Sequence, residues 1–152
     1  MNVKLLRKGV NMYKKILIPT DGSTYVDQVI DRVTNLIPAD GQIIILSVAP
    51  QLHSNTFQRK GRIQELNEEL LEEAIENVEN LEKKFPEGYN IKTIAKTGYP
   101  ADTINNVAQE ENVDLIVISA SGKSGFRKFV IGSVAEKVLK ISKVDVLLVH
   151  KN

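Results

Sequence analysis

The feature that most constrains this fold is the alternation of short apolar segments with helical patterns. The segments "IIILSV" (43–48) and "VDLIVIS" (113–119) are almost entirely apolar, as strands buried on both faces of a sheet are. A helical pattern follows each of them. Strands that alternate with helices form right-handed crossovers and therefore a parallel sheet. We predict an α/β protein.

Five strands and four helices are predicted. The strands lie at residues 16–18, 43–48, 89–98, 113–119 and 144–150, and the helices at 23–37, 63–85, 100–109 and 134–141. Strand 89–98 alternates between apolar and polar residues, so we expect it at a sheet edge. Residues 49–61 have no pattern and are predicted to be a long loop. The expected fold is a doubly wound, five-stranded parallel sheet in the order 3-2-1-4-5, with helices on both faces.

Length and composition limit the domains and the partners. A chain of 152 residues suits one domain, which we place at 13–152 after an N-terminal extension, 1–12. The net charge of +1 gives no general attraction to nucleic acid or to an anionic membrane. Cysteine is absent, which excludes disulfides and thiolate metal sites. No apolar run reaches the roughly 18 residues of a membrane span, and the extension lacks a signal peptide's apolar core. We expect a cytoplasmic protein.

Two glycine-containing loops are the candidate binding site. The first, "PTDGS" (19–23), follows the first strand, and the second, "SASGKSG" (119–125), follows the fourth. Ligands of such sheets bind beyond the carboxyl ends of the strands, where the strand order reverses. If the first and fourth strands are neighbours, both loops face one crevice.

The spacing within the second loop excludes the commonest nucleotide motifs. A Walker loop needs a glycine five residues before "GKS" (122–124), but Val117 stands there. The dinucleotide fingerprint G-x-G-x-x-G is also absent after the first strand. What remains is Gly122, nine further residues and then Gly132-Ser133 at the start of a helix. Glycine backbone and free helical N–H groups are both suited to phosphate oxygens.

With these two loops and this spacing, the chain resembles the universal stress proteins, in their ATP-binding branch. The matching segments are "YKKILIPTDGS", "IIILSVAP" and "VDLIVISASGKSGFRKFVIGSVAEKVLKISKVDVLLV", so the resemblance covers about residues 12–151. The branch's loop pattern, G-x2-G-x9-G-S/T, falls on Ser119, Gly122, Gly132 and Ser133. The first glycine of the pattern is therefore a serine in this chain.

The resemblance implies a ligand, a set of site residues and an assembly. The ligand is ATP or AMP, with magnesium or manganese as an open question. The implied site residues are Pro19, Thr20, Asp21, Val48, Ile118, Ser119, Gly122, Gly132, Ser133 and Val134. The family's dimers imply a homodimer paired through the C-terminal strand, 144–150, which we place at the other sheet edge.

Several residues also have an explanation that needs no ligand. Ser133 followed by Glu136 fits a capping box, and Asp21-Gly22 is a common turn with Ser23 or Thr24 as the cap of the next helix. If Ser119 has a positive φ, its side chain costs about 1 kcal/mol or more.

The sequence leaves three alternative functions to be tested. The first is a nucleotide-binding, dimeric stress-response regulator. The second is a universal stress protein dimer that has lost the nucleotide and acts as a protein-interaction module. The third is an ATP-cleaving or adenylating enzyme, for which the sequence offers no general base: Asp21 is the only acid near the crevice, and His53 and His150 belong to neither loop. Those two histidines, far apart and without acidic companions, also predict no metal site. Any hydrolysis would be slow or dependent on a partner.

Overall fold

The structure is a computed structural model that describes residues 13–23, 26–54, 60–121 and 131–150. Its five strands are β1 (Lys15–Pro19), β2 (Gln42–Ala49), β3 (Asn90–Thr97), β4 (Leu115–Ser119) and β5 (Asp145–Val149). The helices of this part of the chain are α2 (Val26–Leu36), α3 (Lys60–Glu82), α4 (Pro100–Glu110) and α5 (Ser133–Ile141).

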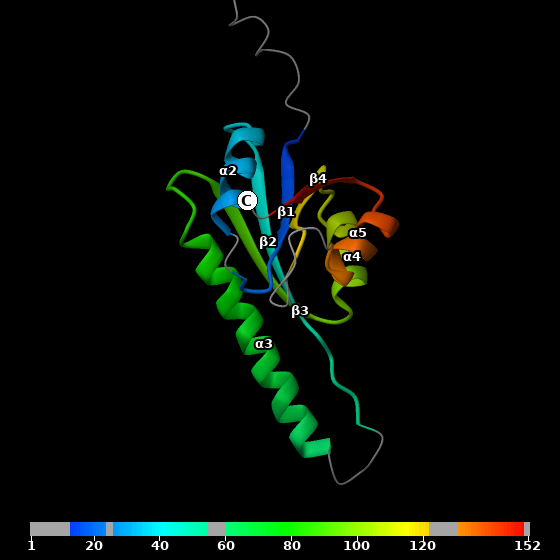
Figure 1. The fold of residues 1–152 in the computed structure, drawn as a ribbon. Helices are drawn as coiled ribbons and strands as arrows, with labels where there is room; N and C mark the ends of the chain where they lie inside the picture. The colour runs from blue at the N-terminus through cyan, green and yellow to red at the C-terminus, as the bar shows by residue number, and fades with distance from the viewer. Residues whose placement is uncertain (1–12, 24–25, 55–59, 122–130, 151–152) are drawn as a thin grey trace, which may run out of the picture.

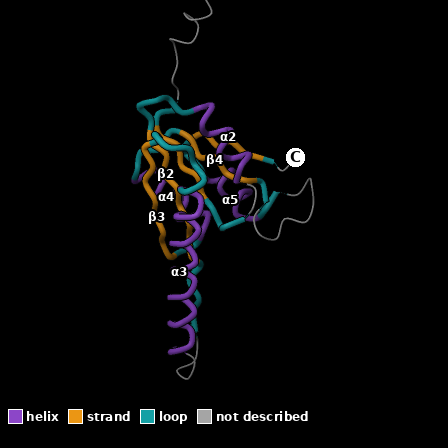
Figure 2. The backbone as a smooth tube through the Cα atoms, turned by 90° about the vertical axis from the view of Figure 1, so that its left-hand side faces the viewer, coloured by secondary structure: helices purple, strands orange, loops and turns teal. Residues whose placement is uncertain are grey.

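The strands form one parallel sheet in the order β3-β2-β1-β4-β5, which confirms the predicted topology. Helices α2 and α3 cover one face and α4 and α5 the other (Figures 1 and 2). Strand β3 is at one edge, as its alternating pattern predicted, and β5 is at the opposite edge.

Each apolar strand serves two cores because successive side chains point to opposite faces. Ile16 and Ile18 of β1 face α2 and α3, whereas Leu17 between them faces α4 and α5. All three are at most 2% exposed. This double burial explains why β1, β2 and β4 have no polar alternation in the sequence.

One helix start agrees with the prediction and others differ from it. Helix α4 begins at Pro100, as predicted, because a missing N–H costs nothing in the first turn. Helix α2 begins at Val26 instead of Ser23, since the Ser23 N–H is held by a turn, 3.0 Å from Asp21 Oδ1. Helix α3 begins at Lys60, inside the predicted loop.

Two contacts join the beginning of the chain to its end. Asp114 Oδ2, just before β4, accepts hydrogen bonds from the backbone N–H groups of Lys14 and Lys15, both at 2.9 Å. The Tyr13 hydroxyl donates to Asp145 Oδ2 at 2.8 Å, and this bond raises the pKa of Tyr13. In the described ranges, no helix is both long and apolar enough to cross a membrane.

Candidate functional site

The turn after β1 forms the first wall of the candidate site. The Thr20 N–H donates to the Leu46 carbonyl at 2.8 Å, which ties the turn to β2. Thr20 Oγ1 accepts the Gly22 N–H at 3.2 Å, and Asp21 Oδ1 accepts the Ser23 N–H. Gly22 has a φ of 80°, so this compact turn requires glycine there. The prediction of a turn at Asp21-Gly22 is confirmed.

The second wall is made where β4 ends and α5 begins. The Gly132 N–H donates to the Ala120 carbonyl at 2.7 Å, and the Ala120 N–H donates to Val149 at 2.8 Å. These bonds hold the two ends of the glycine-containing loop together beside β5. Gly122 and the other residues of that loop between 122 and 130 lie outside the described residues.

The predicted capping box at Ser133 is wrong. The N-cap is Gly132, with φ −63° and ψ 154°, and Ser133 is the first helical residue. The Glu136 side chain bonds Lys140 at 2.8 Å instead of reaching back to the cap, and this bond lowers the pKa of Glu136. Gly132 has no side chain to cap the helix, and the N–H groups of the first turn have no acceptor within α5. Such N–H groups attract anions.

The two walls enclose a cavity of about 300 Å³. Nine of the ten predicted site residues line it, namely Pro19, Thr20, Asp21, Val48, Ile118, Ser119, Gly132, Ser133 and Val134. The tenth, Gly122, is in the undescribed part of the loop. The crevice predicted from the two loops is therefore present, and its ligand stays a prediction.

Further lining residues were missed by the sequence analysis. They are Leu46, Pro50, Pro100, Ile104, Ala120 and Ala135. Pro100 and Ile104 are one turn apart on α4, and with Leu46 and Val48 of β2 they form part of the apolar lining of the cavity. Part of this lining could have been predicted from the sequence, because the start of α4 at Pro100 follows β3 directly and therefore lies near the carboxyl ends of the strands.

The charge of the cavity comes from few groups. Among the described lining residues Asp21 is the only charged one, and none is basic. A bound anion would therefore be held by backbone N–H groups and hydroxyls in this part of the chain. No cluster of three or more potential metal-binding side chains occurs in the described ranges.

Ser119 does not carry the strain considered from the sequence. It is the last residue of β4, and among the described non-glycine residues only Asn112 has a positive φ. The Ser119 hydroxyl donates to the Ser121 carbonyl at 3.3 Å, within its own turn. A side chain is thus accommodated in extended backbone at this position.

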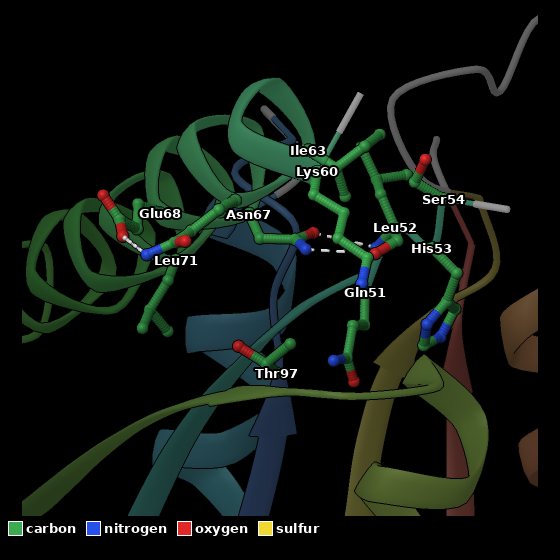
Figure 3. A pocket seen from close by; sticks show the side chains of 11 residues that line it. Gln51, Leu52, His53, Ser54, Lys60, Ile63, Asn67, Glu68, Leu71 and Thr97 are labelled. Atoms are coloured by element: carbon green, nitrogen blue, oxygen red, sulfur yellow. Dashed lines mark hydrogen bonds between the residues drawn. The ribbon is translucent and has the colours of Figure 1, made fainter. Parts of the chain in front are cut away.

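A larger but shallower cavity, about 540 Å³, lies between residues 51–54 and the beginning of α3 (Figure 3). It contains none of the predicted site residues, although Lys60, the first residue of α3, lines it. We therefore assign the candidate site to the smaller cavity.

Comparison with known proteins decides the family. The model of the universal stress protein family matches residues 12–150. This chain belongs to the universal stress protein family. A universal stress protein of Methanocaldococcus jannaschii is 34% identical over 149 residues, which cover 97% of this chain and 88% of that protein. A universal stress protein of Methanothermobacter thermautotrophicus is also 34% identical, over 93% of this chain and 98% of that protein.

Solved structures of universal stress proteins have the same fold. The structure of the Methanocaldococcus jannaschii protein MJ0577 superimposes with a TM-score of 0.79 at 32% identity, over 93% of this chain and 98% of that one. A universal stress protein solved in complex with cAMP gives a TM-score of 0.53 at 28% identity, over 91% of this chain and 97% of that one.

Proposed function

We propose that this universal stress protein binds an adenine nucleotide, ATP or AMP, in the smaller cavity and acts as a dimeric stress-response regulator in the cytoplasm. The observation that carries the proposal is the start of α5, which lines a cavity together with apolar residues of β2 and α4. A nucleotide has the matching chemistry, with an anionic phosphate group at one end and a flat, largely apolar base at the other. The relative in complex with cAMP supports this class of ligand.

The lining residues divide into two groups by their chemistry. The apolar residues Val48, Pro100 and Ile104 would contact the base. The N–H groups of Ser133 and Val134 would bind phosphate oxygens, with Gly122 added from the loop pattern. Asp21 would accept a hydrogen bond from the ribose.

The residues at the cavity favour binding over catalysis. A hydrolase needs a base that activates water, and Asp21 is the only titratable side chain among the described lining residues. We therefore propose that any ATP hydrolysis is slow or needs a partner.

The test is the nucleotide content of the purified protein. We expect mass spectrometry of the denatured protein to release an adenine nucleotide, and calorimetry of the emptied protein to detect ATP or AMP binding. Gly132→Glu places a carboxylate at the start of α5 and should abolish binding. Gly61→Glu is the matched control, because a side chain at Gly61 meets nothing within 4 Å and lies on α3.

The opposite result would favour the second function. If the wild-type protein carries no nucleotide and binds none, the proposed ligand is wrong. The chain would then be a dimeric interaction module whose function lies on its surface.

A further inference from the structure

Helix α3 extends far beyond the sheet that it covers. It runs for 23 residues, yet its buried residues, Ala74, Val78 and Leu81, all lie in its second half. The helix therefore continues for about 20 Å before its first buried residue, at 1.5 Å per residue. Both views show this first half projecting past the carboxyl ends of the strands (Figures 1 and 2). We call residues 60–73, together with 50–54 beside them, the arm.

Residues 50–54, which belong to the arm, cover one side of the helical residues 60–73. The Asn67 side chain binds the Leu52 backbone twice: its Oδ1 accepts the Leu52 N–H at 2.8 Å, and its Nδ2 donates to the Leu52 carbonyl at 3.0 Å. Leu52 itself is 39% exposed. Figure 3 shows Asn67 and Leu71 on the side of α3 that faces this segment.

A second apolar row lies on the helix beside the covered side. Ile63, Leu66 and Leu70 are spaced by three and four residues, which places them on one stripe. Of these three residues, only Ile63 lines the cavity beside residues 51–54. All three are only partly buried. We call these three residues the seam. An apolar row of this spacing on a projecting helix is typical of helix–helix packing.

The charges along the same helix are segregated. Arg62, in the first turn, lies at one edge of the seam, and Glu69, seven residues later, is exposed on the same edge. In two antiparallel copies these like edges face each other, which places Arg62 of each copy beside Glu69 of the other. In two parallel copies the edge would instead face the other side of the seam, where Gln64 lies. Arg62 already pairs with Glu65 at 3.2 Å, but both side chains are 65% exposed and remain accessible to a further acid.

We propose that the arms of two copies pack antiparallel across a twofold axis near the seam. The partner that packs on the apolar row is thus a second copy of this chain, because the charges beside the seam attract those of another copy when the two helices are antiparallel. The twofold arrangement makes the contact self-complementary and closed. This interface goes beyond the proposed function, and it is separate from the edge strand β5, since α3 covers β2 and β3 at the other side of the sheet.

Cross-linking tests the geometry directly. Because the chain has no cysteine, Leu66→Cys introduces a single thiol close to the proposed axis. We expect disulfide-linked dimers to form at least about tenfold faster than with Glu79→Cys, on the exposed side of α3, because pairing raises the effective thiol concentration. Equal rates for the two variants would overturn the proposal.

Charge reversal tests the same interface without removing an apolar residue. Arg62→Glu makes this edge of every arm acidic, and acids at a helix N-terminus favour the helix, so α3 should stay folded. We expect sedimentation velocity to show a smaller assembly than the wild type. Mixing this variant with Glu69→Lys should restore the larger one. An unchanged assembly, or a mixture that stays small, would show that the arm binds something other than its copy.

Discussion

Gly22 is the residue at which backbone and packing requirements coincide. Its φ of 80° disfavours any residue with a side chain, and a Cβ added there would overlap the carboxamide of Asn77 on α3. Asn77 in turn donates weakly, at 3.5 Å, to Ser47, which is buried in β2. The turn that carries Asp21 is thus pressed between the candidate site and α3.

Gly22→Ala should therefore destabilise the protein through two effects. The left-handed backbone costs about 1–2 kcal/mol, and the displacement of Asn77 adds to it. Chemical denaturation measures the free energy of unfolding. Gly88→Ala separates the two effects, because Gly88 has a φ of 97° but nothing within 4 Å of an added Cβ. If Gly22→Ala costs no more than Gly88→Ala, the contact with Asn77 does not hold the turn.

At the scale of the element, α5 combines a stability role with a proposed binding role. A helix without a side-chain cap is less stable than it could be, and its free N–H groups are what a phosphate would use. The sequence pattern of Ser133 and Glu136 suggested a capping box because it satisfies the spacing rule. The bond from Gly132 to Ala120 moves the cap one residue earlier, and this contact between distant segments could not be predicted from local spacing.

Ser133→Asp should show these two roles in opposite directions. A carboxylate in the first turn of α5 stabilises the helix by about 0.3–1 kcal/mol, so Tm should rise. The same charge repels phosphate, so nucleotide affinity should fall at least about tenfold at low salt. Calorimetry and thermal unfolding measure both quantities. Ser133→Asn, which adds no charge, is the control and should leave affinity within about threefold of the wild type; a loss equal to that of Ser133→Asp would argue against an anion there.

At the scale of the whole molecule, the open edge of β5 is the proposed dimer surface. The Val149 carbonyl accepts a bond from Ala120, so this residue's backbone faces β4. The N–H and C=O groups of successive residues in a strand point to opposite sides. Those of Leu147 therefore also point toward β4, whereas those of Val146 point toward the open edge.

Val146→Pro should weaken dimerisation and leave the fold intact. Proline removes an N–H that no strand of the same chain uses, and it is tolerated on edge strands. Leu147→Pro, one residue further, removes a bond to β4 and should lower the unfolding free energy instead. Sedimentation together with circular dichroism distinguishes the two results. An assembly of unchanged size in Val146→Pro would show that the edge of β5 is not a dimer surface.

A parallel sheet covered on both faces was predictable because the strands β2 and β4 are almost entirely apolar. Its strand order was taken from the doubly wound fold class, because the apolar runs do not determine which strands are neighbours. The edge position of β3 followed from its alternation. The projection of α3 was not predictable, since its apolar spacing continues unchanged from the buried half into the arm. Part of the apolar lining of the cavity was missed because the spacing of Ile104 is that of an ordinary core residue of α4.

The position of β1 in the middle of the sheet has a consequence for how the protein is made. This strand is synthesised first, and β2 and β3 can join it early, but its other neighbour, β4, begins a hundred residues later, at Leu115 against Ile16. The candidate site is built at that junction, from the ends of β1 and β4. A nascent chain therefore has three of its five strands and no binding site until its last third has emerged, and ligand binding can stabilise only chains that have been completed.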